Sequence, residues 1–159
     1  MNTVGRKADN YKLNHLYTNI NGDRGDYYYL CVYCGSPASE RDHVPPLSRV
    51  DDYRSLMLKK EIYIKVPSCV QCNGIGASIL DDTFLDRVER IKSKIAEKHK
   101  KKISYPEWDE EDLAELDYEL KTKVLEGVEL KKTITNMVNY YEGVDLVLDH
   151  LDVLFGGQQ

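Results

Sequence analysis

The sequence predicts an α+β fold, in which a unit of two strands and one helix is followed by a C-terminal helical extension. Three observations predict it. Two Cys-x-x-Cys pairs lie far apart in the first half of the chain. Between them, residues 61–66 alternate apolar and polar side chains, as a half-buried strand does. Beyond residue 80, apolar side chains recur every three or four positions, which is typical of helices with one buried face.

The four cysteines form a candidate zinc site, made of Cys31, Cys34, Cys69 and Cys72. Each pair turns the chain so that both sulfurs face one point, and two pairs supply the four thiolates of a closed tetrahedral site. The first ten residues lack the apolar core of a signal peptide, so we expect a cytoplasmic protein. There, cysteines are more often metal ligands than disulfides. We therefore predict a structural zinc that staples the unit together.

Two strands are predicted between the cysteine pairs. The first covers residues 40–44 and stops at Pro45-Pro46, because proline cannot donate to a sheet ladder. The second covers residues 61–66, with Ile62, Ile64 and Val66 on one face. A short helix and a further strand are predicted at residues 11–17 and 27–30.

Helices are predicted for most of the remaining chain. A turn at Asn73-Gly74-Ile75-Gly76 leads into a helix whose apolar face extends to Ile95 and which ends in the basic run 98–102. Pro106 marks a boundary, because it restricts the residue before it to extended geometry. The apolar spacing beyond it predicts helices at residues 113–127, 134–141 and 144–155.

Charge divides the chain at the same boundary. Residues 1–102 carry 18 Lys and Arg against 13 Asp and Glu, whereas residues 103–159 carry 4 against 14. We therefore predict a front domain, residues 1–102, that meets phosphate, and an acidic helical region, residues 103–159, although acidic helices are also simply well solvated. The rear helices bury their apolar faces either on the front domain or in a homodimer. No apolar run approaches the ~18 residues of a membrane span.

The residues around the cysteines resemble the zinc-containing HNH nucleases, the ββα-metal group. That pattern runs Cys-x-x-Cys, then Asp-His-x-x-Pro, then Cys-x-x-Cys-Asn, and here it includes Asp42-His43 and Asn73, over about residues 27 to 80. A narrower similarity is to the recombination endonuclease VII family of phages, in which helices that build a dimer follow the motif. The resemblance implies a metal-dependent DNA endonuclease that leaves 5′-phosphate and 3′-hydroxyl ends.

The resemblance also implies a role for each motif residue. His43 would be the general base, and Asp42 and Asn73 would hold one Mg²⁺ or Mn²⁺. Neighbours on a strand point to opposite faces, so the strand must end or bend at Asp42-His43 for both to serve one centre. Phosphate contacts are predicted at three basic residues, Arg41, Arg49 and Arg54, each of which is equally consistent with a solvated side chain.

One residue of the family pattern has no counterpart, since no Asn lies between Val44 and Cys72 where the family has its middle Asn. This supports an alternative, a catalytically decayed HNH-fold zinc module that acts in protein or nucleic-acid interaction. Taken singly, His43 also fits a structural residue and Asn73 a helix cap. A sequence-specific DNA-binding regulator has little support, because no helix carries a concentrated basic face.

Overall fold

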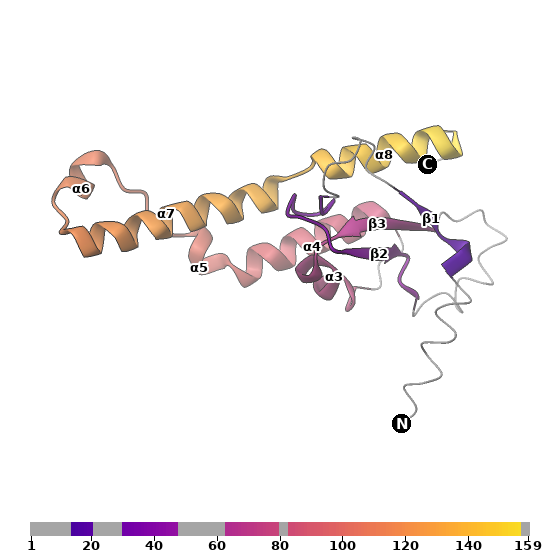
Figure 1. The fold of residues 1–159 in the computed structure, drawn as a ribbon, viewed down its shortest axis with the longest axis horizontal. Coiled ribbons are helices and arrows are strands. Elements are labelled where there is room, and N and C mark those ends of the chain that lie inside the picture. Colours follow the sequence, from indigo (N-terminus) through magenta and orange to yellow (C-terminus); the bar gives the residue numbers. More distant parts are fainter. Residues whose placement is uncertain (1–13, 21–29, 48–62, 80–82, 157–159) are drawn as a thin grey trace, which may run out of the picture.

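The computed structural model describes residues 14–20, 30–47, 63–79 and 83–156 (Figure 1). The fold is mixed α+β and mostly helical, with a small sheet and a long helix in the C-terminal half. The predicted α+β class is thus confirmed. In chain order the elements are the 3₁₀ helix η1 (Asn14–Leu16), β1 (Thr18–Asn19), β2 (Glu40–Val44), β3 (Ile64–Ser68), α3 (Val70–Gly76), α4 (Phe84–Lys98), α5 (Lys100–Ile103), α6 (Glu110–Ala114), α7 (Tyr118–Asn139) and α8 (Glu142–Phe155).

The sheet has three strands in the order β1-β3-β2, with β3 parallel to β1 and antiparallel to β2. The predicted strand at 40–44 is confirmed as β2. The second strand was expected to end at Val66, but β3 continues to Ser68 because β2 pairs with it along its whole length, from Glu40 opposite Ser68 to Val44 opposite Ile64. Residues 61 and 62 lie outside the described part of the chain. The pairing with β1 was not predicted.

Helix α3 begins at the second cysteine pair. Cys69 is its N-cap, and the Cys69 Sγ atom accepts a hydrogen bond from the backbone N–H of Cys72 at 3.4 Å. The expectation of a turn at residues 73–76 is therefore wrong, because the thiol cap starts the helix before Asn73. Helix α4 begins separately at Phe84, and its N-cap is Thr83, whose hydroxyl oxygen accepts a hydrogen bond from the N–H of Asp86 at 3.1 Å.

The long helix α7 runs through Gly127, where a helix end was expected. Gly127 instead provides a close packing position, since a Cβ atom there would overlap the ring of Tyr105. The start of this region also differs from the prediction, because α6 ends at Ala114 and Asp117 caps a new helix. The Asp117 carboxylate accepts from the N–H of Leu120 at 2.9 Å.

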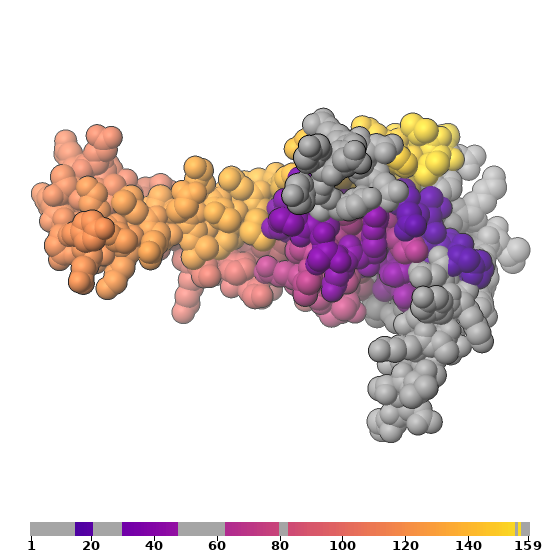
Figure 2. Space-filling view, viewed as in Figure 1, coloured from indigo at the N-terminus to yellow at the C-terminus, as the bar shows by residue number. Residues whose placement is uncertain are grey.

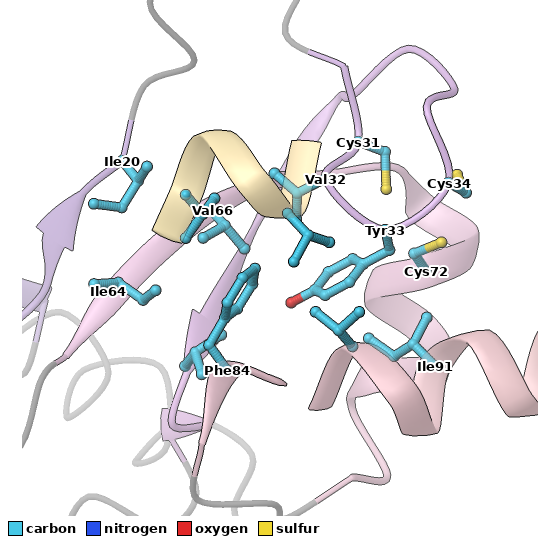
Figure 3. Packing of buried hydrophobic residues seen from close by; sticks show 14 of the residues in the cluster. Ile20, Cys31, Val32, Tyr33, Cys34, Ile64, Val66, Cys72, Phe84 and Ile91 are labelled. Carbon is cyan, nitrogen blue, oxygen red and sulfur yellow. The ribbon is translucent and has the colours of Figure 1, made fainter. Parts of the chain in front are cut away.

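One apolar core unites the cysteine pairs, the sheet, α4 and α8 (Figure 3). From α4 it takes Val88, Ile91 and Ile95, all fully buried, and from α8 it takes Val144 and Val147. The C-terminal helix α8 thus buries its apolar face against the cysteine pairs, the sheet and α4. These elements belong to residues 1–102, so this is one of the two predicted alternatives. Of the described helices, none combines the length and the apolar character needed to cross a bilayer.

Helix α7 lies beside α4 and α5, and its N-terminal end projects from the body together with α6 (Figures 1 and 2). Three leucines of α7, Leu120, Leu125 and Leu130, keep more than 40 % of their surface exposed. The homodimer through the C-terminal helices stays a prediction.

Candidate metal centre and its surroundings

The four cysteine sulfurs converge on one point, with all four Sγ atoms within 4.8 Å of one another. The Sγ atoms of Cys34 and Cys69 lie 3.8 Å apart. Four sulfurs at a zinc–sulfur distance of about 2.3 Å stand about 3.8 Å from one another in a tetrahedron. The arrangement therefore suits a structural metal ion such as zinc.

Backbone hydrogen bonds hold each cysteine pair in shape. In the first pair, the N–H of Gly35 donates to the carbonyl of Cys31 at 2.9 Å, and Gly35 takes the left-handed φ of +74° that favours glycine. In the second, the N–H of Asn73 donates to the carbonyl of Cys69 at 2.9 Å. A bond of 3.1 Å from the N–H of Val32 to the carbonyl of Pro67 then joins the first pair to β3.

The sulfur cluster favours a bound cation electrostatically. A hydrogen bond with Cys34, together with burial, raises the pKa of the Cys31 thiol to about 12, against the lowering effect of a hydrogen bond with Cys72. Hydrogen bonds from Cys31 and Cys72 lower the pKa of Cys34 to about 2. Negative charge thus stays on few of the crowded sulfurs unless a bound cation stabilises further thiolates, which is the chemistry of a thiolate metal site.

Asp42, a predicted cation ligand, lies buried with 3 % of its surface exposed. Its Oδ2 atom accepts hydrogen bonds from Tyr33 Oη at 2.6 Å and from Arg87 Nε at 2.7 Å, and its Oδ1 atom accepts from Arg87 Nη2 at 2.7 Å. Burial lowers the pKa of Arg87, but the bonds to Asp42 more than offset this and raise it above the ordinary value. Burial also raises the pKa of Tyr33 well above its usual range. Both carboxylate oxygens are therefore committed within the protein.

Asn73, the other predicted ligand, lies on α3 and reaches back to β2. Its Nδ2 atom donates to the Oε2 atom of Glu40 at 2.5 Å. Glu40 and Asp42 are two residues apart on β2 and so share one face of the strand. The structure thus places Asn73 and Asp42 on the facing surfaces of α3 and β2, with Glu40 as the direct partner of Asn73.

His43 points to the other face of β2, since its strand position alternates with that of Asp42. Its ring meets the ring of Tyr17 edge-on, with 4.8 Å between the centroids and 86° between the planes. Burial, with a contribution from the charge of Lys65, lowers the pKa of His43 to about 4. The imidazole is therefore neutral near pH 7.

The expected bend at Asp42-His43 is absent from β2. The strand stays in register through three consecutive pairs, in which Asp42, His43 and Val44 oppose Val66, Lys65 and Ile64. Such a bend was a condition for Asp42 and His43 to serve one centre, and β2 does not meet it, because β3 pairs with the whole of β2, up to the prolines that follow it.

Of the three predicted phosphate contacts, only Arg41 lies in the described part of the chain. Its Nη1 atom donates to the carbonyl of Ile20 at 2.9 Å. Arg49 and Arg54 lie outside the described residues.

Two buried cations of α4 were missed from the sequence. Arg87 and Lys92 are 1 % and 3 % exposed. A signal for both exists in the helical spacing: Arg87 stands three residues after Phe84, and Lys92 four residues after Val88, so both lie on the apolar face. A charged residue that is buried on that face needs a partner. Its position in the sequence therefore indicates a buried ion pair or hydrogen bond with another element of the fold.

No protein-family model, curated protein or solved structure matches the chain significantly.

Proposed function

We propose that the chain is a zinc-stapled DNA endonuclease that depends on Mg²⁺ or Mn²⁺. The observation that supports this best is the four-cysteine cluster. It joins the segment before β2 to the junction of β3 and α3, and so holds His43 and Asn73 on one rigid unit. Hydrolysis of a phosphodiester needs such fixed positions, because misplacing a base or a cation ligand by about 1 Å costs roughly 10²-fold in rate.

His43 is the proposed general base. Its neutral imidazole accepts a proton from the water whose oxygen attacks phosphorus. The bond from phosphorus to the 3′-oxygen then breaks, and that oxygen takes up a proton to become a 3′-hydroxyl. The phosphate stays on the 5′-oxygen of the next nucleotide.

The divalent cation would offset the negative charge that grows on the phosphate during attack. Asn73 and its partner Glu40 offer the oxygen atoms that Mg²⁺ and Mn²⁺ prefer, and both residues lie at the accessible edge of β2 and α3. Asp42 does not fit as a direct ligand, because Arg87 and Tyr33 occupy both of its oxygens. We therefore assign the cation to the Asn73 side of β2. Because His43 lies on the opposite face, a phosphodiester that meets both groups would have to lie across the open edge of β2, which is an edge strand of the described sheet.

Supercoiled plasmid tests the proposal. Zinc-loaded protein is expected to convert it to nicked circles when Mg²⁺ or Mn²⁺ is added and to leave it intact without them. The nicks should be sealed by DNA ligase, which requires a 5′-phosphate beside a 3′-hydroxyl. Protein that retains its zinc but leaves the plasmid intact in the presence of Mg²⁺ and in the presence of Mn²⁺ would contradict the proposal.

A second candidate is a zinc module that binds a partner without cutting, and the Asp42–Arg87 pair specifically favours it. In such a module Asp42 has only a structural role, and His43 serves packing against Tyr17. Retarded migration of DNA with no cleavage in either cation would favour this candidate.

A further inference from the structure

Asp42 and Arg87 form an ion pair that closes the space between β2, α3 and α4. Two guanidinium nitrogens donate to the two carboxylate oxygens, and the third, Nη1, donates to the carbonyl of Ile79 at 2.7 Å. Tyr33 adds a third donor to the carboxylate. Every nitrogen of the guanidinium group has an acceptor, which is the two-pronged geometry that fixes an arginine most firmly.

Gly76 of α3 makes room for this pair. A Cβ atom at position 76 would lie 2.7 Å from Arg87 Nη2 and 3.5 Å from Asp42 Oδ2. The guanidinium therefore lies against the helix that also carries Asn73, at a point where only glycine lets it approach. Gly74, in the same helix, has open space around its Cβ position.

We infer that Asp42 is the internal counter-ion of Arg87, a positioning residue that fixes β2 on α3 and α4, and that Asp42 does not bind the divalent cation. The inference rests on the proposed function only where it concerns the cation. Asp42 is 3 % exposed and each of its oxygens already accepts a bond from Arg87, so a cation could reach this buried carboxylate only at the expense of the ion pair. The arginine would then be a buried charge without a partner, which is strongly unfavourable.

The first test is thermal unfolding of Asp42→Asn and Arg87→Met, each with its zinc content measured. Each substitution leaves one buried charge unpaired, so each should lower Tm by roughly 10 °C. The double variant should lose clearly less than the sum of the two, because it leaves neither charge behind. Asp149→Asn, at an exposed position of α8, is the matched control and should shift Tm by no more than about 2 °C.

Glycine substitutions test the same geometry independently. Gly76→Ala should lower Tm, because the new methyl group displaces the guanidinium. Gly74→Ala should leave Tm equal or raise it, since alanine favours a helix and meets nothing there.

The second test measures the affinity of the zinc-loaded protein for Mn²⁺ by electron paramagnetic resonance. Asp42→Asn should keep the wild-type affinity within about threefold, whereas Asn73→Ala should lose at least about tenfold. If wild type binds no Mn²⁺, the cation of the proposed function fails, and the Tm values alone decide the inference. A Tm within about 2 °C of wild type for Asp42→Asn overturns it. So does a tenfold loss of Mn²⁺ affinity in that variant at wild-type zinc content.

Discussion

Lys92 of α4 donates a hydrogen bond to the carbonyl oxygen of Tyr33, between the first two cysteines, at 3.0 Å. The same ammonium group donates to the carbonyls of Val138, at 3.0 Å, and Tyr140, and lies 4.2 Å from the centroid of the Tyr141 ring. Burial lowers its pKa. One charged group thus joins the first cysteine pair to the junction of α7 and α8. The position of α8 therefore depends on the fold of the cysteine pairs.

Lys92→Met should therefore loosen the C-terminal helix. The variant leaves one buried and two partly buried carbonyls without their shared donor. Each such bond to a charged group contributes about 1.5–3 kcal/mol, but methionine also removes the cost of burying the ammonium group, so we expect a net loss of about 3 kcal/mol. Urea unfolding measures the loss, and hydrogen exchange should be faster over residues 140–155. Lys94→Met, at an exposed position of the same helix, should change stability by no more than about 0.5 kcal/mol. Equal effects of the two variants would contradict the prediction.

Gly143 allows α8 to approach the first cysteine pair. A Cβ atom at this position would lie 2.8 Å from the Cα atom of Val32, which is backbone and cannot turn aside. Gly143→Ala should thus destabilise the protein by about 1–3 kcal/mol, the usual cost of overpacking. Differential scanning calorimetry compares it with Gly74→Ala, for which no loss is expected. A stabilised Gly143→Ala would show that α8 packs elsewhere.

Zinc removal should unfold much of the front of the molecule, because the four sulfurs sit in the same core as α4 and α8. Cys69→Ser should abolish most of the folded state, measured by circular dichroism and by the elemental zinc content. Wild type should carry about one zinc per chain when it is purified without chelator. Less than about half an equivalent in folded wild type would count against the site.

The pKa of His43 predicts how stability depends on pH. The folded-state pKa is lowered from 6.5 to about 4, so the unfolded chain binds a proton more readily between these values. Stability should consequently fall as the pH falls from about 6.5 toward 4, and His43→Gln should remove that part of the loss. Urea midpoints at about pH 7 and pH 5 measure it, at matched zinc content. A pH dependence equal in the two proteins would contradict the burial of the imidazole.

The local patterns of the sequence predicted those elements that local forces decide. Pro45-Pro46 set the end of β2, and the spacing of the cysteines predicted their convergence. The thiol cap at Cys69 was not foreseen, since cysteine is an unusual cap and Asn73 looked like the better helix start.

Tertiary contacts decided what the sequence could not reveal. Gly127 has the local character of a helix end, yet Tyr105, far away in the chain, requires a glycine there within a helix. Asp42 has the character of a cation ligand, yet its partner Arg87 comes from a helix 45 residues away. Contacts between residues so far apart in the chain produce no periodic pattern in the sequence. Their one sequence signal is the presence of charged residues on the apolar face of α4.

Cleavage of supercoiled plasmid by His43→Ala tests the central claim most directly. Zinc, rather than His43, holds the scaffold, so the variant should keep its zinc and its affinity for DNA while losing at least ~10²-fold in the rate of Mg²⁺- or Mn²⁺-dependent nicking. His150→Ala, a histidine of α8, should cut at the wild-type rate. Nicking by His43→Ala at the wild-type rate, with the same cation requirement, would contradict the assignment of His43 as general base.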